Sequence, residues 1–355
     1  MRDFENRFGP TPTGEHTFYP VRFGIRRAAG PTPDFVRTQS DYVVHLSDLH
    51  FGADHGFPRS REPGREPVIA RIKEDLNIIC DGRPGLVIIS GDLTTKADAN
   101  ALLIEGGEFL NQIEQELRVP KEAILVIPGN HDFRLSEYRP TDYSHERPFN
   151  LMLKNFYGDY DPDNKFRYFN FPSGRMAEFL LINSVRLRQL EESNYGYVEW
   201  VLYESRLRTM SHDPEITRIA LLHHHLISVP REESVDRQYP HAGISTTLDS
   251  GAVIEGLQAH GFRLALHGHQ HVPGLTRVSR GIMAGGEVGM NNFSSDLVTL
   301  SAGSAGARTE RLTDAIRDNS YNILKMTRDE IQIDARRFNP GLPASRHFFA
   351  RLQLR

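Results

Sequence analysis

The sequence predicts an α/β protein in which two packed mixed β-sheets are flanked by helices, a four-layer α-β-β-α sandwich. Three observations favour this class. In the first third of the 355 residues, short β-branched runs alternate with helical patterns, which is typical of a layered parallel sheet. Toward the end of the chain, the patterned segments are mostly strand-like. The composition, 39% hydrophobic and 25% charged, is that of a globular protein and excludes wholesale disorder.

Five elements follow one another in the first third of the chain. Short apolar runs predict buried strands at residues 42–46, 86–90 and 123–127. Between them, apolar residues recur at helical spacing in 67–80, where Pro67 suits the first turn of a helix, and again in 97–117. Strand, helix, strand, helix, strand is the order from which parallel sheets are built.

The rest of the chain continues this alternation and then changes to strands. Residues 166–171 and 178–184 alternate or run apolar, as paired strands do. Helices are expected near 196–209 and 249–259, each leading into a short apolar strand. The segments expected to form these and the later strands are 219–222, 263–266, 276–280, 297–303, 321–327 and 330–338. Residues 134–165 show no motif, and we interpret them as a loop that covers a cleft.

The sequence predicts three regions. Residues 1–39 carry five prolines and four glycines without a sustained period, which indicates an N-terminal extended arm. Residues 40–335 form the domain proper. Residues 336–355 carry five arginines and no acid, and we expect a basic C-terminal tail that Phe348 and Phe349 dock onto the domain.

Charge and hydropathy limit the partners and the location. The formal net charge of −4 excludes a protein that coats DNA through electrostatics alone, although it leaves room for a local basic patch. No apolar run approaches the roughly 18 residues that span a bilayer, and the first residues are charged and broken by Gly-Pro. We therefore expect a cytoplasmic protein without a membrane partner.

Metal-competent side chains follow five of the predicted strands, at the point where each strand ends. The five segments read Asp48-Leu49-His50, Gly91-Asp92, Gly129-Asn130-His131-Asp132, His223-His224-His225 and Gly268-His269-Gln270-His271. Because ligands of α/β sheets bind outside the carboxyl ends of the strands, we expect these segments to meet in one crevice. Each segment alone is a weak signal, and their occurrence together at successive strand ends is a strong one.

The number of candidate ligands predicts two metal ions. From these segments we count two carboxylates, one amide oxygen and four imidazoles as ligands, with His131 left over. A tetrahedral zinc takes four protein ligands at most, so the set suits two divalent ions that share a carboxylate. Oxygen and imidazole ligands without thiolate favour Mn, Fe or Zn.

The ordered set SDLH, GDL, GNHD, HH and GHQH resembles the calcineurin-like metallophosphoesterase superfamily, over residues 42 to about 271. The resemblance implies that one ion is held by Asp48, His50, Asp92 and His271. It implies that the second is held by Asp92 as a bridge, Asn130, His223 and His269. His131 and Asp132 correspond to the family's catalytic pair beside the metals, in which the carboxylate holds the imidazole.

The remaining histidines are assigned by position. His224 follows a predicted ligand and is expected to contact the substrate or to support the ligands. His55 lies in the glycine-rich loop after the first ligand pair, where a substrate contact at the rim is expected. His45 and His267 lie inside strands and should be buried hydrogen-bonding groups, because alternation points them away from the neighbouring ligands.

The resemblance implies a hydrolase for a phosphodiester, a cyclic nucleotide or related small diester, attacked in line by a hydroxide that bridges the two metals. SDLH with GNHD is similar to the bacterial phosphodiesterases that include the class III cyclic-nucleotide enzymes. The expected partner is a small-molecule phosphoester; a nucleic acid is less favoured. A DNA exonuclease or other nuclease and a phosphomonoesterase are the enzymatic alternatives, and a metal-free scaffold protein is the non-enzymatic one.

Overall fold

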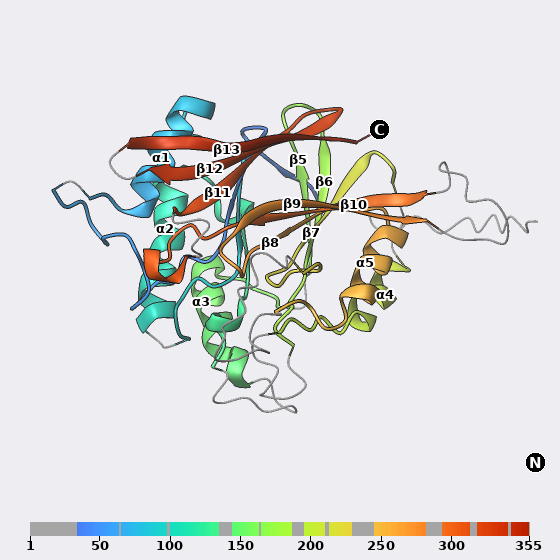
Figure 1. Ribbon diagram of the computed structural model, residues 1–355, viewed down its shortest axis with the longest axis horizontal. Helices are drawn as coiled ribbons and strands as arrows, with labels where there is room; N and C mark the ends of the chain where they lie inside the picture. The colour runs from blue at the N-terminus through green and yellow to red at the C-terminus, as the bar shows by residue number, and fades with distance from the viewer. Residues whose placement is uncertain are drawn as a thin grey trace, which may run out of the picture. The chain divides into compact units, whose positions relative to one another are not determined.

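Two mixed β-sheets form the centre of the fold, as the computed structural model in Figure 1 shows. The structure describes residues 34–63, 65–97, 100–134, 144–162, 165–186, 195–209, 213–228, 245–281, 293–312, 318–339 and 342–354. All of them belong to one compact unit, Pro33–Arg355. Most of the expected N-terminal arm, residues 1–33, lies outside the described residues.

The first sheet has six strands in the order β13-β12-β11-β2-β3-β4. Its strands are β2 (Tyr42–Leu46), β3 (Leu86–Ser90), β4 (Ile124–Ile127), β11 (Ser320–Met326), β12 (Glu330–Asn339) and β13 (Leu342–Gln353). β2, β3 and β4 are parallel, and Leu46 pairs with Ile89, which pairs with Val126. This register brings the carboxyl ends of the three strands to the same edge of the sheet.

The second sheet has seven strands in the order β1-β5-β6-β7-β8-β10-β9. Its strands are β1 (Val36–Arg37), β5 (Phe166–Asn170), β6 (Met176–Leu181), β7 (Ile216–Leu221), β8 (Phe262–His267), β9 (Pro273–Gly281) and β10 (Phe293–Ala302). β6, β7, β8 and β10 run parallel, and β9 returns antiparallel to β10. The predicted fold class is confirmed.

Helices cover the outer faces of both sheets, with α1, α2 and α3 gathered on one side and α4 and α5 on the other (Figure 1). The helices are α1 (Val68–Cys80), a π-helical turn (Asn100–Gly106) that leads into α2 (Gly107–Glu116), α3 (Arg147–Tyr157), α4 (Val201–Leu207) and α5 (Ser250–Ala259). The described 3₁₀ turns are Lys121–Ala123, Asn130–Asp132, Ser144–Glu146 and Thr309–Arg311. Among the described helices, none has the length and apolar character that a membrane crossing requires.

The hydrophobic core explains why the elements stack in layers. Ile219 and Leu221 of β7 join the large buried cluster that includes the apolar residues of the first sheet. Ala220, between them, joins a second cluster with Trp200 and Leu257 from the helical side. Alternate residues of one strand therefore face different layers, as the pleat of a strand requires.

The helix α3 was not expected, because it falls within residues 134–165, which we interpreted as a loop. Its buried residues, Phe149, Met152, Leu153 and Phe156, recur at helical spacing, and this signal was present in the sequence. Residues 135–143 lie outside the described part of the chain, so a cover over the cleft stays a prediction.

The C-terminal segment forms regular sheet structure. The expected limit at residue 335 falls inside β12, and β13 then pairs with β12 along almost its whole length. Phe348 packs against the core, whereas Phe349 is 40% exposed and lies under the guanidinium groups of Arg346 and Arg351. Only one of the two phenylalanines therefore docks as expected.

Arg336 in β12 anchors this segment to helix α1. Its Nε and Nη2 atoms donate to the buried carboxylate of Asp75 at 2.8 and 2.6 Å, and the hydroxyl of Tyr321 donates to the same carboxylate. Asp75 and Tyr321 are fully buried. The three side chains satisfy one another where water does not reach, so each depends on the others.

Replacing Arg336 with alanine should lower the free energy of unfolding by about 3–5 kcal/mol, because the Asp75 carboxylate would be left buried without its cation. Urea denaturation of the full chain measures the change. The control is Arg351→Ala, since Arg351 is 60% exposed and its ion pair with Glu330 is 3.8 Å long; we expect a loss of about 1 kcal/mol or less. Equal losses in the two variants would contradict the anchoring role.

Candidate metal centre

The five predicted ligand segments meet at the carboxyl ends of β2, β3, β4, β7 and β8. Backbone hydrogen bonds continue beyond the strands and tie these segments together: the amide of Asp48 donates to the Gly91 carbonyl at 3.0 Å, and the amide of Gly268 donates to the His223 carbonyl at 3.1 Å. The first sheet thus presents Asp48 and Asp92. The second sheet presents His223, His269 and His271.

Strained backbone is concentrated at this edge. Five of the eight non-glycine residues with positive φ in the described chain are predicted ligands: Asp48, His50, Asp92, His269 and His271. Left-handed conformations cost about 1–3 kcal/mol each and persist where the surrounding structure holds them. Here they turn ligand side chains from both sheets toward one point. The ligand segments are therefore not simply extended, as an alternation in which residues i and i+2 point the same way would require.

Two glycines make the close approach of these turns feasible. A Cβ atom on Gly268 would lie 1.7 Å from the Oγ of Ser47 and 2.4 Å from Oδ2 of Asp48. A Cβ atom on Gly129 would lie 2.1 Å from Oδ1 of Asp92. Any side chain at either position would therefore displace a predicted ligand.

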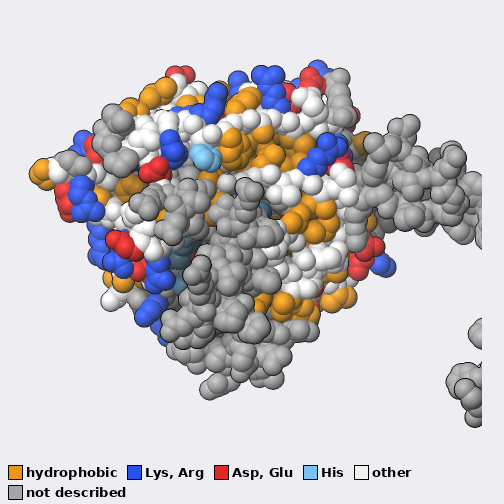
Figure 2. Space-filling model, in the orientation of Figure 1, with side chains coloured by type: hydrophobic (Ala, Val, Ile, Leu, Met, Phe, Trp, Pro, Cys, Tyr) orange, Lys and Arg blue, Asp and Glu red, His pale blue; other side chains and the backbone are white. Residues whose placement is uncertain are grey.

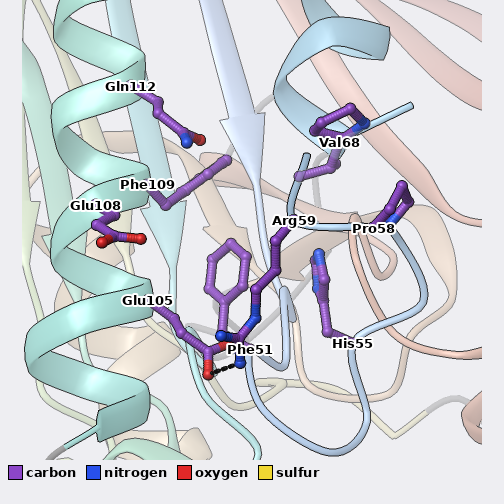
Figure 3. Close-up of a pocket in the computed structure, with 10 residues that line it drawn as sticks. Phe51, His55, Pro58, Arg59, Val68, Glu105, Glu108, Phe109 and Gln112 are labelled. Carbon is purple, nitrogen blue, oxygen red and sulfur yellow. Dashed lines mark hydrogen bonds and ion pairs between the residues drawn. The ribbon is translucent and has the colours of Figure 1, made fainter. Parts of the chain in front are cut away.

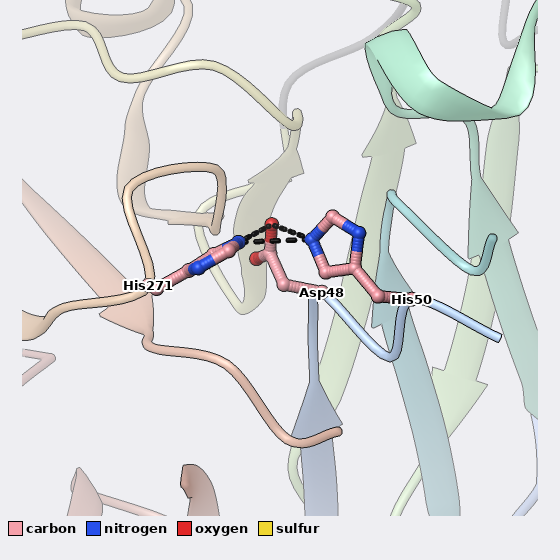
Figure 4. A group of neighbouring side chains, drawn as sticks. All are labelled: Asp48, His50 and His271. Carbon is pink, nitrogen blue, oxygen red and sulfur yellow. Dashed lines mark hydrogen bonds and ion pairs between the residues drawn. The ribbon is translucent and has the colours of Figure 1, made fainter. Parts of the chain in front are cut away.

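The first cluster consists of Asp48, His50 and His271 (Figure 4). The Nε2 atoms of the two histidines lie 2.9 Å apart, and Nε2 of His271 lies 3.4 Å from Oδ1 of Asp48. That oxygen is buried and has no hydrogen-bond partner. One carboxylate oxygen and two imidazole nitrogens that converge in this way fit a divalent ion.

The second cluster consists of Asp92, His223 and His269. Nε2 of His223 lies 3.3 Å from Oδ2 of Asp92 and 3.2 Å from Nδ1 of His269. The same Asp92 oxygen lies 3.9 Å from Nε2 of His50, which belongs to the first cluster. Asp92 therefore lies between the two clusters, where a bridging ligand must be.

Asn130 completes the predicted ligand set. Its Oδ1 atom is buried without a hydrogen-bond partner, and the next amide, that of His131, donates to Oδ1 of Asp92 at 2.9 Å. An orphaned buried amide oxygen costs free energy unless something binds it. A metal ion shared with Asp92 would satisfy it.

Backbone carbonyls fix the orientation of two ligand rings. Nδ1 of His223 donates to the Ser90 carbonyl and Nδ1 of His271 donates to the Arg311 carbonyl, each at 2.8 Å. Both rings then direct Nε2 toward the clusters. Such contacts on the far nitrogen hold the tautomer that a metal requires.

The ionisable groups of the two clusters are strongly perturbed. Burial lowers the pKa of His50 to about 4 and that of His269 to about 3, so both rings are neutral and ready to bind an ion. Burial would also lower the pKa of His223, but the adjacent Asp92 carboxylate outweighs it and raises the pKa to about 9. Burial opposes the ionisation of Asp48, yet its contact with His271 brings the pKa down to about 2.

His131 lies beside the first cluster, with its ring centroid 5.2 Å from that of His50. The expectation that Asp132 holds this ring is wrong. Nδ1 of His131 instead donates to the Thr95 carbonyl at 2.8 Å, and the buried Asp132 carboxylate accepts hydrogen bonds from the amides of Leu93, Thr94 and Gly129. Adjacent residues in a tight turn point in different directions, so Asp132 fastens the turn to its neighbour.

His224 is fully buried next to the second cluster. Its Nδ1 lies 2.9 Å from the Oγ of Ser184, and its ring centroid lies 4.4 Å from that of His269. This contact supports a ligand ring rather than exposing His224 to a substrate. His45 is buried with its Nε2 at 2.9 Å from the Oγ of Ser90, and His267 is 5% exposed, as expected for both.

His55 lines a partly open surface cavity, and none of the predicted ligands is among the residues that line it (Figure 3). Its ring lies between those of Phe51 and Phe57, and its Nδ1 donates to the Leu49 carbonyl at 2.7 Å. An ion pair between Arg59 and Glu105 borders the same cavity. The expected substrate contact of His55 stays a prediction.

Sequence reasoning missed two residues that position the site, Thr95 and Arg311. Both act through backbone carbonyl groups, which any residue type provides. Arg311 also lies 40 positions beyond its partner His271, so no local motif could indicate the contact.

Comparison with known proteins identifies the family. A sequence profile described as calcineurin-like phosphoesterase matches residues 42–273, more than half of the chain. A comparison with curated proteins finds no match.

Among solved structures, the chain is similar to PhoD at 10% identity and a TM-score of 0.47, over 88% of this chain and 70% of that one. It is similar to a 5′-nucleotidase precursor from Thermus thermophilus at 10% identity and a TM-score of 0.40, over 88% and 54%. It is also similar to zinc-complexed Vps29 from Entamoeba histolytica at 10% identity and a TM-score of 0.35, over 88% and 99%.

Metal binding should release protons and should tighten as the pH rises toward 9. In the metal-free protein the His223 ring keeps its proton below a pKa of about 9, so a lower pH favours the metal-free form. Calorimetric titration of Mn²⁺ in buffers of different ionisation enthalpy measures the released protons at each pH. A binding enthalpy that does not depend on the buffer at pH 7 would contradict the assignment of His223 as a ligand.

Proposed function

Because the chain belongs to the calcineurin-like phosphoesterase family, we propose that it hydrolyses a small phosphodiester with the help of two divalent metal ions. The position of Asp92 between two ligand clusters carries this proposal. Asp48, His50 and His271 would hold one ion, and Asn130, His223 and His269 the other. The ligand chemistry suits Mn, Fe or Zn.

Two divalent ions in such a site lower the pKa of water and neutralise charge on the phosphoryl oxygens. The chain's own groups prepare the site for them. The Asp48 and Asp92 carboxylates stay ionised at neutral pH, because the pKa of Asp48 is about 2 and that of Asp92 is well below its ordinary value. Burial alone would raise the pKa of both carboxyl groups, and the neighbouring histidines outweigh that effect.

His131 is the group that would assist the leaving alkoxide. Its Nδ1 is bound to the Thr95 carbonyl, so a proton on Nε2 is the one available for transfer. A positioned imidazole of this kind contributes as a general acid when its proton reaches the leaving oxygen. The fixed ring also keeps Nε2 in place while the substrate binds.

A small-molecule substrate is favoured over a nucleic acid. Four of the five arginines of residues 336–355 are paired with acids, in the pairs Arg336–Asp75, Arg337–Asp318, Arg346–Asp334 and Arg351–Glu330. On the face drawn in Figure 2, Lys and Arg side chains are interspersed with Asp and Glu. Nucleic-acid binding depends on clustered positive charge, which these pairs reduce.

A metal-free scaffold is disfavoured by the ligand set, because two groups of one carboxylate and two imidazoles each converge closely enough to hold an ion. We prefer a diester substrate, either a cyclic nucleotide or a related small diester. This preference rests on the similarity of SDLH and GNHD to the motifs of bacterial phosphodiesterases. The cytoplasmic location stays a prediction.

Hydrolysis of bis(p-nitrophenyl) phosphate should exceed hydrolysis of p-nitrophenyl phosphate in the protein loaded with Mn²⁺. Initial rates over a range of concentrations give kcat/KM for each ester, and metal analysis gives the ion content. A preference for the monoester would make the protein a phosphomonoesterase. Absence of both bound metal and turnover would overturn the enzymatic proposal.

Replacing His131 with alanine should reduce kcat for the diester by about 10²–10⁴-fold, because the leaving alkoxide would lose its proton donor. Both metal ions should stay bound, since His131 is not among the clustered ligands. The control is His347→Ala, an exposed histidine of β13. Loss of an ion from the His131 variant would show that His131 is a ligand instead.

A further inference from the structure

The side chains of two arginines, Arg308 and Arg311, have no role in the proposed hydrolysis. They belong to residues 304–312, which follow β10 and run along the loop after β2. The Oγ of Ser304 donates to the Asp48 carbonyl at 2.7 Å, and the amide of Arg308 donates to the Asp54 carbonyl at 2.8 Å. The carbonyl of Arg311 holds the ring of His271. The segment is therefore fixed directly against the ligands.

The carboxylate of Asp54 holds both guanidinium groups in place. Nη2 of Arg308 lies 2.6 Å from Oδ1 of Asp54, and Nη2 of Arg311 lies 2.8 Å from Oδ2. The Asp54 side chain is 8% exposed, whereas those of Arg308 and Arg311 are 48% and 57% exposed. One buried acid thus orients two cations that reach solvent.

Most donors of the two guanidinium groups are available. Each guanidinium carries five N–H groups in a planar fork. Among the described residues, Asp54 is the only hydrogen-bond or ion-pair partner of either group. The trio of Arg308, Arg311 and Asp54 therefore keeps a net positive charge and has N–H groups left for an oxygen acceptor.

Short contacts place this trio next to the catalytic groups on two sides. The amide of Asp54 donates to Oγ1 of Thr95 at 3.1 Å, and the Thr95 carbonyl holds the ring of His131. On the other side, Arg311 touches His271 through its carbonyl. The segment that carries the two arginines and the residue that pairs with them are therefore linked through one or two hydrogen bonds to His271 and His131.

We propose that Arg308 and Arg311 bind a second anionic group of the substrate, so that the substrate is a phosphodiester that carries a further phosphate or carboxylate. This proposal rests on the proposed function, because that function identifies the phosphodiester group that is cleaved. Guanidinium groups match the oxygen geometry of phosphate and carboxylate, and they make two parallel hydrogen bonds where an ammonium makes a point contact. Asp54 sets this geometry before the substrate arrives, which reduces the entropy lost on binding.

The test compares two probes that differ by one phosphate, thymidine 3′,5′-bisphosphate and thymidine 5′-phosphate. Calorimetric titration of the full chain loaded with Mn²⁺ gives the Kd of each. The wild-type protein should bind the bisphosphate about tenfold more tightly, the range expected for one charge-assisted contact. Arg311→Gln and Arg308→Gln should each reduce this preference severalfold, and Arg311→Lys should retain part of it.

The control is Arg208→Gln, which removes an exposed arginine with an ion pair to Glu204 on α4 and should leave the preference unchanged. Equal Kd values for the two probes in the wild-type protein would overturn the proposal. So would a preference that persists in both the Arg311 and the Arg308 variants.

The two proposals fail separately. Bis(p-nitrophenyl) phosphate carries no second anionic group, so its hydrolysis by the wild-type protein tests the proposed function alone. Turnover of this ester without any preference between the thymidine probes would overturn only the anion site. A preference that depends on Arg311 in a protein without turnover would leave the anion site standing and overturn the proposed hydrolysis.

Discussion

The whole site depends on the Asp92 carboxylate, which lies between two groups of imidazoles. A buried carboxylate is stable only where positive charge or hydrogen-bond donors compensate it. In the metal-free protein, His223 supplies that compensation by keeping its proton to a pKa of about 9. Two cations would supply it instead once bound, so the folded chain already has the charge arrangement of a binuclear centre.

The site exists only because two sheets pack with their strand ends at the same place. The first sheet provides Asp48, His50 and Asp92 from turns after β2 and β3, while His223 and His271 come from turns after β7 and β8 of the second sheet. Packing of the two inner faces into one hydrophobic core fixes the distance between them. The core residues therefore determine the separation of the ligands, although none of them is a predicted ligand.

Local backbone strain and backbone carbonyls do the fine positioning. Positive φ values turn the ligand side chains, and the carbonyls of Ser90, Thr95 and Arg311 orient three histidine rings. Because these contacts use the main chain, a side-chain substitution at Thr95 or Arg311 leaves them in place. The Arg311 side chain is then free for another task, and Asp54 holds it in place.

The sequence by itself determined the fold class and most of the strands, because apolar periodicity is a local signal. Polar residues at strand ends, together with the family resemblance, also named the side chains that meet in the two clusters. It did not reveal α3, whose apolar spacing was present but lay in a stretch without motifs. Nor did it reveal that residues 336–339 and 342–353 belong to strands of the first sheet. Only the tertiary structure decided that Thr95 rather than Asp132 holds His131, and that Asp54 pairs with both Arg308 and Arg311. These are contacts between distant segments, set by packing and by chain direction in turns, and a linear pattern carries no information about them.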